Sequence, residues 1–127
     1  MIEYHMIDAN VLDGTRAYAA ADLYVSPSRE DSFGMPVAEA LACGLPAITS
    51  PFAGVSSLLR DGLDSFILPD PQDAKTLAGR IRTLCEQSDL RARMGQAAAD
   101  ASPLWTWDRN AAAIWQCLKQ ASRGKHP

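Results

Sequence analysis

The sequence predicts an α/β fold, a three-layer sandwich in which helices cover a mainly parallel β-sheet. Two short runs of strand-forming residues, 23–26 and 45–50, are separated by one helical segment. Strands joined through a helix pair in parallel, because the helix returns the chain to the edge of the sheet where the first strand began. With 127 residues the chain is long enough for one domain with its own core.

The segment between the two strands carries the signals of a helix start and a helix end. Pro27 stops the first strand, and Pro36 suits the first position of the helix. Small or apolar residues then recur at helical spacing: Val37, Ala40, Leu41 and Ala42. Gly44 is placed to end the helix before the second strand begins.

Caps and periodicity predict the remaining elements. Upstream, residues 2–7 form a strand, and a short helix capped by Asp13 or Thr15 runs to residue 21. Residues 54–60 form another short helix, and the Asp61-Gly62 turn leads into a third strand at residues 65–68. Asp73 caps a long helix, and two further helices follow, capped by Ser88 and Thr106. Residues 1–122 form the domain, and residues 123–127 are a loose tail.

Aromatic residues mark the last predicted helix. Its apolar stripe comprises Trp107, Ala111, Ile114, Trp115 and Leu118. Trp105, Trp107 and Trp115 have the shape to stack on a base, but their helical spacing favours packing. We therefore expect these three side chains to be structural.

Two carboxylates, Asp31 and Glu39, flank the predicted helix start and are separated by seven residues. We expect Glu39 near the first turn, where backbone N–H groups and the helix dipole favour an anion. The two oxygens of a carboxylate can accept hydrogen bonds from both hydroxyls of a sugar diol. A phosphate flanked by two sugars would satisfy the amides and the carboxylates together, which describes a nucleotide sugar. On their own, the two acids would equally fit a role as helix-start residues.

The stretch from Asp31 to Glu39 resembles the Glu-x7-Glu motif of retaining glycosyltransferases with the GT-B fold, also called group 1 or family four. The resemblance continues on both sides, in residues 20–28 (Ala-Ala-Asp-Leu-Tyr-Val-Ser-Pro-Ser) and 39–46 (Glu-Ala-Leu-Ala-Cys-Gly-Leu-Pro). It covers about residues 15–120. It implies a Rossmann-like C-terminal domain portion that binds the sugar donor.

The family's residue roles transfer to matching positions of this sequence. Glu39 resembles the glutamate that binds the ribose hydroxyls, and Asp31 takes the place of the one that contacts the transferred sugar. The segment from Ser32 through Phe33 and Gly34 to Met35 resembles the backbone that approaches donor sugar and diphosphate. Asp31 and Glu39 are the expected catalytic pair. The resemblance implies a UDP- or GDP-sugar as substrate, no cofactor and no metal.

The sequence departs from the family pattern in three ways. The first acid is an aspartate, one methylene shorter than the usual glutamate. Ser56 and Ser57 stand where the family often has a glutamate, and the basic stretch that binds the diphosphate does not occur in the chain. We therefore expect an incomplete, inactive portion of an enzyme of glycan, polysaccharide or glycolipid synthesis, lacking an N-terminal acceptor domain.

Other readings remain open. The chain could be a non-catalytic nucleotide-sugar-binding or assembly module, or part of another GT-B enzyme such as a nucleotide-sugar epimerase. We also expect self-association through an exposed sheet edge or helix face.

Composition predicts a cytoplasmic domain, with peripheral membrane association in a full-length enzyme. The net charge of −3 argues against nucleic acid, and no apolar run reaches transmembrane length. The start of the chain lacks the pattern of a signal peptide. Cys43, Cys85 and Cys117 are odd in number and widely spaced, so we expect buried free thiols.

Overall fold

A computed structural model describes residues 14–123 of the chain, with side chains placed for residues 16–122. Three strands, β1 (Tyr24–Ser26), β2 (Ala47–Thr49) and β3 (Ser65–Ile67), form a parallel sheet in the order β1-β2-β3. In the register, Ile48 lies opposite Val25 on one side and Phe66 on the other. The predicted α/β class is confirmed. The strand predicted at residues 2–7 lies outside the described residues.

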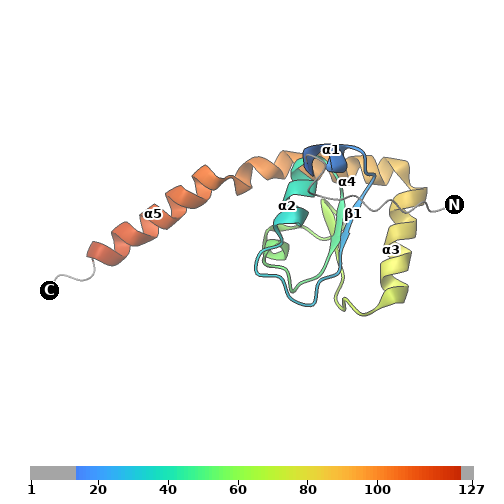
Figure 1. Cartoon of the computed structure of the whole chain (residues 1–127), viewed down its shortest axis with the longest axis horizontal. Coiled ribbons are helices and arrows are strands. Elements are labelled where there is room, and N and C mark those ends of the chain that lie inside the picture. The colour runs from blue at the N-terminus through green and yellow to red at the C-terminus, as the bar shows by residue number, and fades with distance from the viewer. Residues whose placement is uncertain (1–13, 124–127) are drawn as a thin grey trace.

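Helices connect and cover the strands. Before the third strand, the chain forms α1 (Gly14–Ala19), α2 (Met35–Ala42) and the 3-10 helix η1 (Gly54–Leu58). After it come α3 (Ala74–Glu86), α4 (Ser88–Ala101), the 3-10 helix η2 (Ser102–Trp105) and α5 (Trp107–Arg123). Figure 1 shows α2 and α3 on opposite sides of the strands.

The two faces of the sheet carry two separate apolar clusters. One packs α2 and η1 against the sheet through Val37, Leu41, Ala47, Ala53, Val55 and Ala98. The other packs α3 against the opposite face through Ile48, Phe66, Leu68, Leu84 and Met94. Ala47 and Ile48 are neighbours in β2 and point to opposite faces, because side chains alternate along a strand. The three layers of the sandwich follow directly from this alternation.

Helix α4 joins the two clusters, because Met94 belongs to one of them and Ala98 to the other. It passes the segments that precede β2 and β3, at the amino ends of the strands. Near β2, a Cβ atom on the buried Gly95 would overlap the carbonyl oxygen of Gly44, so only glycine permits this approach. The carboxyl ends of the strands lie at the opposite edge of the sheet.

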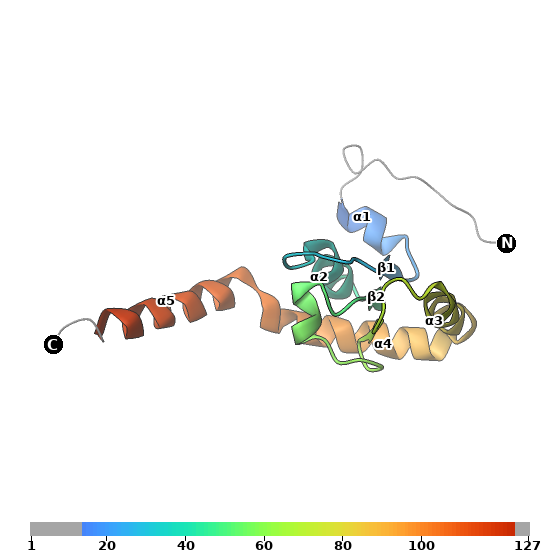
Figure 2. The ribbon, with the colours of Figure 1, turned by 90° about the horizontal axis from the view of Figure 1, so that it is seen from below.

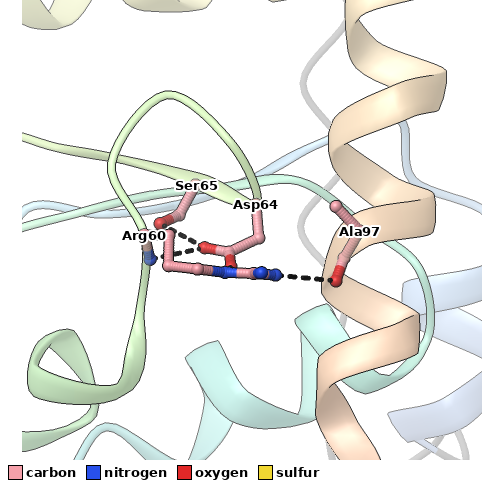
Figure 3. Close-up of polar contacts among 4 residues, drawn as sticks. All are labelled: Arg60, Asp64, Ser65 and Ala97. Atoms are coloured by element: carbon pink, nitrogen blue, oxygen red, sulfur yellow. Dashed lines mark hydrogen bonds and ion pairs between the residues drawn. The ribbon is translucent and has the colours of Figure 1, made fainter.

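A buried carboxylate ties the loop before β3 to the same helix (Figure 3). Asp64 is fully buried and accepts hydrogen bonds from the backbone N–H of Arg60 at 2.9 Å and from its Nε at 2.7 Å. Ser65 Oγ lies 3.2 Å from the same carboxylate. The Arg60 guanidinium reaches Ala97 O of α4 at 3.5 Å.

The helix ends follow the sequence signals with small shifts. Gly44 adopts φ +79° and, with Leu45, donates to carbonyls of the last turn of α2, as in a Schellman cap. Asp73 caps α3 by accepting from two backbone N–H groups, and Thr106 caps α5. Two predicted caps are wrong: Ser88 is the first residue of α4, and Thr15 lies within α1. Asp13 lies outside the described residues.

The last helix differs from its predicted packing. α5 extends away from the sheet in both views (Figures 1 and 2). Trp107 is 73% exposed and Trp115 is 57% exposed, so the expectation that they pack was wrong for this chain, whereas Trp105 is half-buried. The helix also continues through Arg123, which shortens the predicted loose tail. The stripe lacks a surface to cover it within residues 14–123.

The cysteine prediction also needs correction. Cys43, Cys85 and Cys117 are free, as expected, but all three are exposed. Cys43 caps the end of α2, where the chain turns at the surface, and Cys85 occupies the last turn of α3. Cys117 lies on the extended α5. The core beneath α3 ends at Leu84, and the neighbouring Cys85 faces solvent.

Candidate functional site

The site predicted from the sequence lies in the loop between β1 and α2, at the carboxyl end of β1. This loop is held by the loop that follows β2. The backbone N–H of Asp31 donates to Phe52 O at 3.2 Å, and the N–H of Val55 donates to Phe33 O at 2.7 Å. A Cβ on Gly54 would overlap the carbonyl oxygen of Ser32. The close contact of the two loops therefore depends on glycine at that position.

Asp31 is half-buried and turns one oxygen back on its own loop. Its Oδ1 accepts a hydrogen bond from the backbone N–H of Phe33 at 3.2 Å. This bond closes an Asx-type turn, a local structural role that suits aspartate better than the longer glutamate. The carboxylate therefore shapes the loop that leads into α2, and it does so next to the position where a donor sugar was predicted.

Glu39 lies on α2, but further along it than predicted. The helix begins at Met35 and its first turn contains no acidic residue, so Glu39 stands one turn beyond the free N–H groups. Pro36 is the second helical residue rather than the first. The exposed Glu39 carboxylate accepts a hydrogen bond from the hydroxyl of Tyr18, with Oε2 at 2.9 Å from the phenol oxygen.

Two tyrosines connect the carboxylates. Burial, followed by the hydrogen bond to Glu39 and its charge, raises the pKa of Tyr18 to about 12. Burial also raises the pKa of Tyr24, and the charges of Glu39 and Asp31 add to this effect. Both Asp31 and Glu39 therefore act on the Tyr24 phenol through their charges.

Residues 32–35, four of the seven between the acids, lead into α2. Gly34 is buried and adopts φ +87° as the N-cap residue, and its Cβ position would crowd Val55 Cγ1. Ser32, Phe33 and Met35 are exposed around it. Within residues 14–123 no side chain caps this helix. Pro36 has no N–H, and the N–H of Val37 donates to Gly34 O, so the N–H groups left without a capping side chain at this helix start are those of Gly34 and Met35.

Two shallow hollows lie beside the site, and neither is lined by Asp31 or Glu39. One, of about 380 Å³, opens at the carboxyl ends of the strands between Arg29, Phe52 and the loop after β3. The other, of about 420 Å³, lies at the opposite edge of the sheet, where Tyr18, Asp22 and Arg91 contribute to its lining. The two carboxylates themselves lie on an open surface of the described chain.

Sequence reasoning missed Tyr18 and Tyr24 as members of this site. Tyr24 read as an ordinary strand residue, and Tyr18 lay in a short helix without a motif of its own. The only available signal was their closeness in sequence to the Ala-Ala-Asp segment. Contact between Tyr18 and Glu39 joins residues that are 21 positions apart, which no local pattern reveals.

The described residues contain neither a cluster of metal ligands nor a membrane-spanning helix. Between residues 14 and 123, the chain does not bring three or more His, Cys, Asp or Glu side chains together as a metal site would require. In that part of the chain, every helix is too short or too polar to cross a bilayer.

The sequence and the fold both match known proteins. The model of the family "Glycosyl transferases group 1" matches residues 13–101. A D-inositol 3-phosphate glycosyltransferase of Xylanimonas cellulosilytica is 34% identical over 106 residues, which are 84% of this chain and 25% of that protein. The enzyme of the same name from Streptomyces bingchenggensis is 35% identical over 107 residues, 84% of this chain and 23% of that protein.

Among solved structures, sucrose-phosphate synthase of Thermosynechococcus elongatus superposes with a TM-score of 0.75 and 27% identity. The superposition covers 86% of this chain and 27% of the synthase. Anabaena HepE in complex with UDP has a TM-score of 0.70 at 24% identity, over 84% of this chain and 29% of that one, and shows a shared fold.

The residues of the candidate site lie within the segment that matches the family. The chain spans about a quarter of the length of the curated relatives it matches. The matched segment contains β1, α2 and both carboxylates. The chain therefore belongs to the glycosyl transferases group 1 family.

Proposed function

We propose that this chain forms the donor-binding portion of a retaining glycosyltransferase, which transfers a sugar from a nucleoside diphosphate sugar to an acceptor hydroxyl. The observation that carries the proposal is that Asp31 lies in the loop at the carboxyl end of β1, just before the start of α2, the helix that bears Glu39. Ligands of open α/β sheets bind at this edge. The family match over the same residues supports the reading.

Each residue has a proposed role. Glu39 accepts hydrogen bonds from the ribose hydroxyls of the donor, and Asp31 contacts the transferred sugar. The backbone from Ser32 to Met35, with Gly34 at its centre, approaches the sugar and the diphosphate. At the start of α2, the N–H groups of Gly34 and Met35 and the positive end of the helix dipole stabilise negative charge.

Charge on the diphosphate grows as the bond to the sugar breaks. N–H groups that are already aimed at the leaving oxygens stabilise this charge without reorganising, and they favour the transition state over the ground state. The proposed transfer keeps the configuration of the anomeric carbon and uses no metal. The fold is compatible with such a donor, since Anabaena HepE, which shares it, is known in complex with UDP and with UDP-glucose.

The direct test is titration of the chain with UDP and with GDP, monitored by nuclear magnetic resonance. We expect saturable but weak binding, because only one side of the cleft is present. Glu39→Ala should weaken binding about tenfold, the effect typical of losing hydrogen bonds to a charged group. Glu86→Ala is the matched control, because Glu86 is an exposed glutamate at the far end of α3.

Three outcomes are informative. Equal affinity of the Glu39→Ala variant and the unchanged chain would show that the ribose role is wrong. A loss in Glu86→Ala that equals the loss in Glu39→Ala would indicate a general charge effect instead of a specific contact. A higher affinity for UDP or for GDP would identify the base of the donor nucleotide.

Transfer activity needs the rest of an enzyme, so it is tested in a chimera. Residues 13–101 of this chain replace the matching segment of the Xylanimonas glycosyltransferase. Turnover that disappears with Glu39→Ala supports a transferase. A folded chimera that binds UDP without turnover supports the second candidate, a non-catalytic nucleotide-sugar-binding module. An epimerase would release a free sugar or an isomerised nucleotide sugar without acceptor.

The exposed stripe of α5 and the half-buried strand β1 are the surfaces that we propose for partners. Three quarters of the relatives' length lies outside this chain, and an N-terminal acceptor domain would cover these surfaces in a complete enzyme. In isolation they favour self-association. Sedimentation should then show a mass that rises with concentration, and Trp115→Ser should lower it. The cytoplasmic location and the peripheral membrane association remain predictions from the sequence.

A further inference from the structure

The hydrogen bond between Tyr18 and Glu39 joins two elements that are distant in sequence. Tyr18 belongs to α1, and its hydroxyl donates to Oε2 of Glu39 on α2 at 2.9 Å. Its ring meets the ring of Tyr24 edge-on, with centroids 6.0 Å apart and planes at 70°. Tyr24 is part of β1. The Tyr18 ring therefore packs against a residue of β1, while its hydroxyl is hydrogen-bonded to the Glu39 carboxylate.

An exposed glutamate would otherwise be mobile. Its side chain has three rotatable bonds, and ordering it costs conformational entropy when a ligand binds. A tyrosine has only two such bonds, and here its ring packs against a second ring. The hydrogen bond therefore selects one orientation of the Glu39 carboxylate before any ligand arrives.

The phenol is suited to remain a donor. Burial, together with the bond to Glu39 and its charge, raises the pKa of Tyr18 to about 12. The hydroxyl thus keeps its proton at every pH at which the domain is expected to work. It occupies one acceptor position of Oε2, and an ionised carboxylate offers about four such positions on its two oxygens. The remaining positions are sufficient for a diol.

We propose that Tyr18 is a positioning residue that orients the Glu39 carboxylate toward the ribose hydroxyls of the donor nucleotide. The proposal rests on the ribose role of Glu39 given above, and it adds a residue that acts through Glu39. Its effect must appear only with ligands that carry the ribose hydroxyls. A purely structural tie between α1 and α2 would act on every ligand alike.

The test compares UDP with dideoxy-UDP, the analogue that lacks both ribose hydroxyls, on isotope-labelled full chain. Tyr18→Phe removes the hydroxyl and keeps the ring contact with Tyr24. We expect this variant to bind UDP about fivefold more weakly than the unchanged chain and to bind dideoxy-UDP equally well. In a Glu39→Gln background, Tyr18→Phe should have no further effect on UDP.

The dideoxy analogue also serves as the folding control, because a misfolded variant would lose affinity for both nucleotides. Equal losses for the two nucleotides would make Tyr18 a structural residue and overturn the inference. An unchanged UDP affinity in Tyr18→Phe would overturn it as well.

Failure of the inference and failure of the proposed function are distinguishable. If Glu39→Gln abolishes the preference for UDP while Tyr18→Phe preserves it, the ribose role stands and the positioning role is wrong. If Glu39→Gln preserves that preference, the ribose role itself is wrong. If neither nucleotide gives saturable shifts at millimolar concentration, the proposed function fails, and the positioning role fails with it.

Discussion

Helices α4 and α5 follow one another along the chain, and both are amphipathic, yet they meet different surroundings. Helix α4 buries Met94, Gly95 and Ala98. In α5, Ile114 is 53% exposed and Trp115 is 57% exposed. The periodicity of a sequence determines which residues share a face of a helix. Whether that face is buried depends on a complementary surface, and the described part of this chain supplies one only to α4.

The surface that receives α4 is built from distant parts of the chain. Gly44 turns the chain just before β2 and lets α4 approach at Gly95. Asp64 holds Arg60 so that its guanidinium reaches Ala97. Within residues 14–123, α5 lies beside η2 and then extends away from the sheet, as Figure 1 shows. The difference between the helices can be tested residue by residue.

The largest expected effect is at Met94. Met94→Ala should lower the free energy of unfolding by about 2–5 kcal/mol, because it leaves a cavity between α3, α4 and the sheet. Ile114→Ala in α5 should change it by less than about 0.5 kcal/mol at low protein concentration. Urea denaturation measures both. Similar losses in the two variants would mean that α5 packs on the domain in solution.

The next effect concerns the closest approach of α4. Gly95→Ala should cost about 1–3 kcal/mol, because the added methyl group meets the backbone of Gly44, which cannot move aside as a side chain would. Gly79→Ala in α3 is the matched control, since no atom lies within 4 Å of its Cβ position. The control should stabilise the protein by about 0.5–1 kcal/mol through helix propensity. A stable Gly95→Ala variant would show that α4 is loosely held.

A similar but more local effect is expected at Asp64. Asp64→Ala leaves the backbone N–H of Arg60 and the hydroxyl of Ser65 without their acceptor, at a cost of about 1–3 kcal/mol. Arg60→Ala should cost less, because the Arg60 side chain is 55% exposed and its pairing is screened by water. Thermal unfolding of both variants compares them. Equal losses would assign the stabilisation to the ion pair rather than to the buried acceptor.

The smallest effect is the cap of α3. Hydrogen bonds from Thr76 and Lys75 lower the pKa of Asp73, so the ionised form is favoured in the folded state. The stabilisation is present above the pKa of an ordinary aspartate and is lost as the pH falls through the lowered value. Asp73→Ala should therefore lower Tm by a few degrees at neutral pH and by less in acid. A difference that is independent of pH would contradict the charged cap.

Most of the fold could be predicted because its signals are local. Strand-forming runs, the Gly44 cap and the Asp73 cap each depend on a few adjacent residues, and the structure reproduces them with small shifts. Errors occurred where several assignments were locally possible. Ser88 and Thr15 are both good cap residues, and only the observed helix starts show that they lie inside their helices.

The candidate site was only partly predictable. The two carboxylates and the glycine between them follow from the motif, although their roles in binding remain proposals. The effect of their charges on Tyr24 and the hydrogen bond from Tyr18 to Glu39 depend on how α1, β1 and α2 assemble. The support of the loop by Gly54 likewise comes from a neighbouring strand connection.

The sequence by itself determined the α/β class, the parallel pairing and the position of both acids at the helix that follows β1. These features depend on periodicity, caps and chain connectivity, which act over a few residues. Only the tertiary structure decided that α4 is buried while α5 is exposed, that the cysteines face solvent, and that Tyr18 meets Glu39. Contacts between distant segments depend on the shapes of both surfaces, and a local pattern describes only one of them.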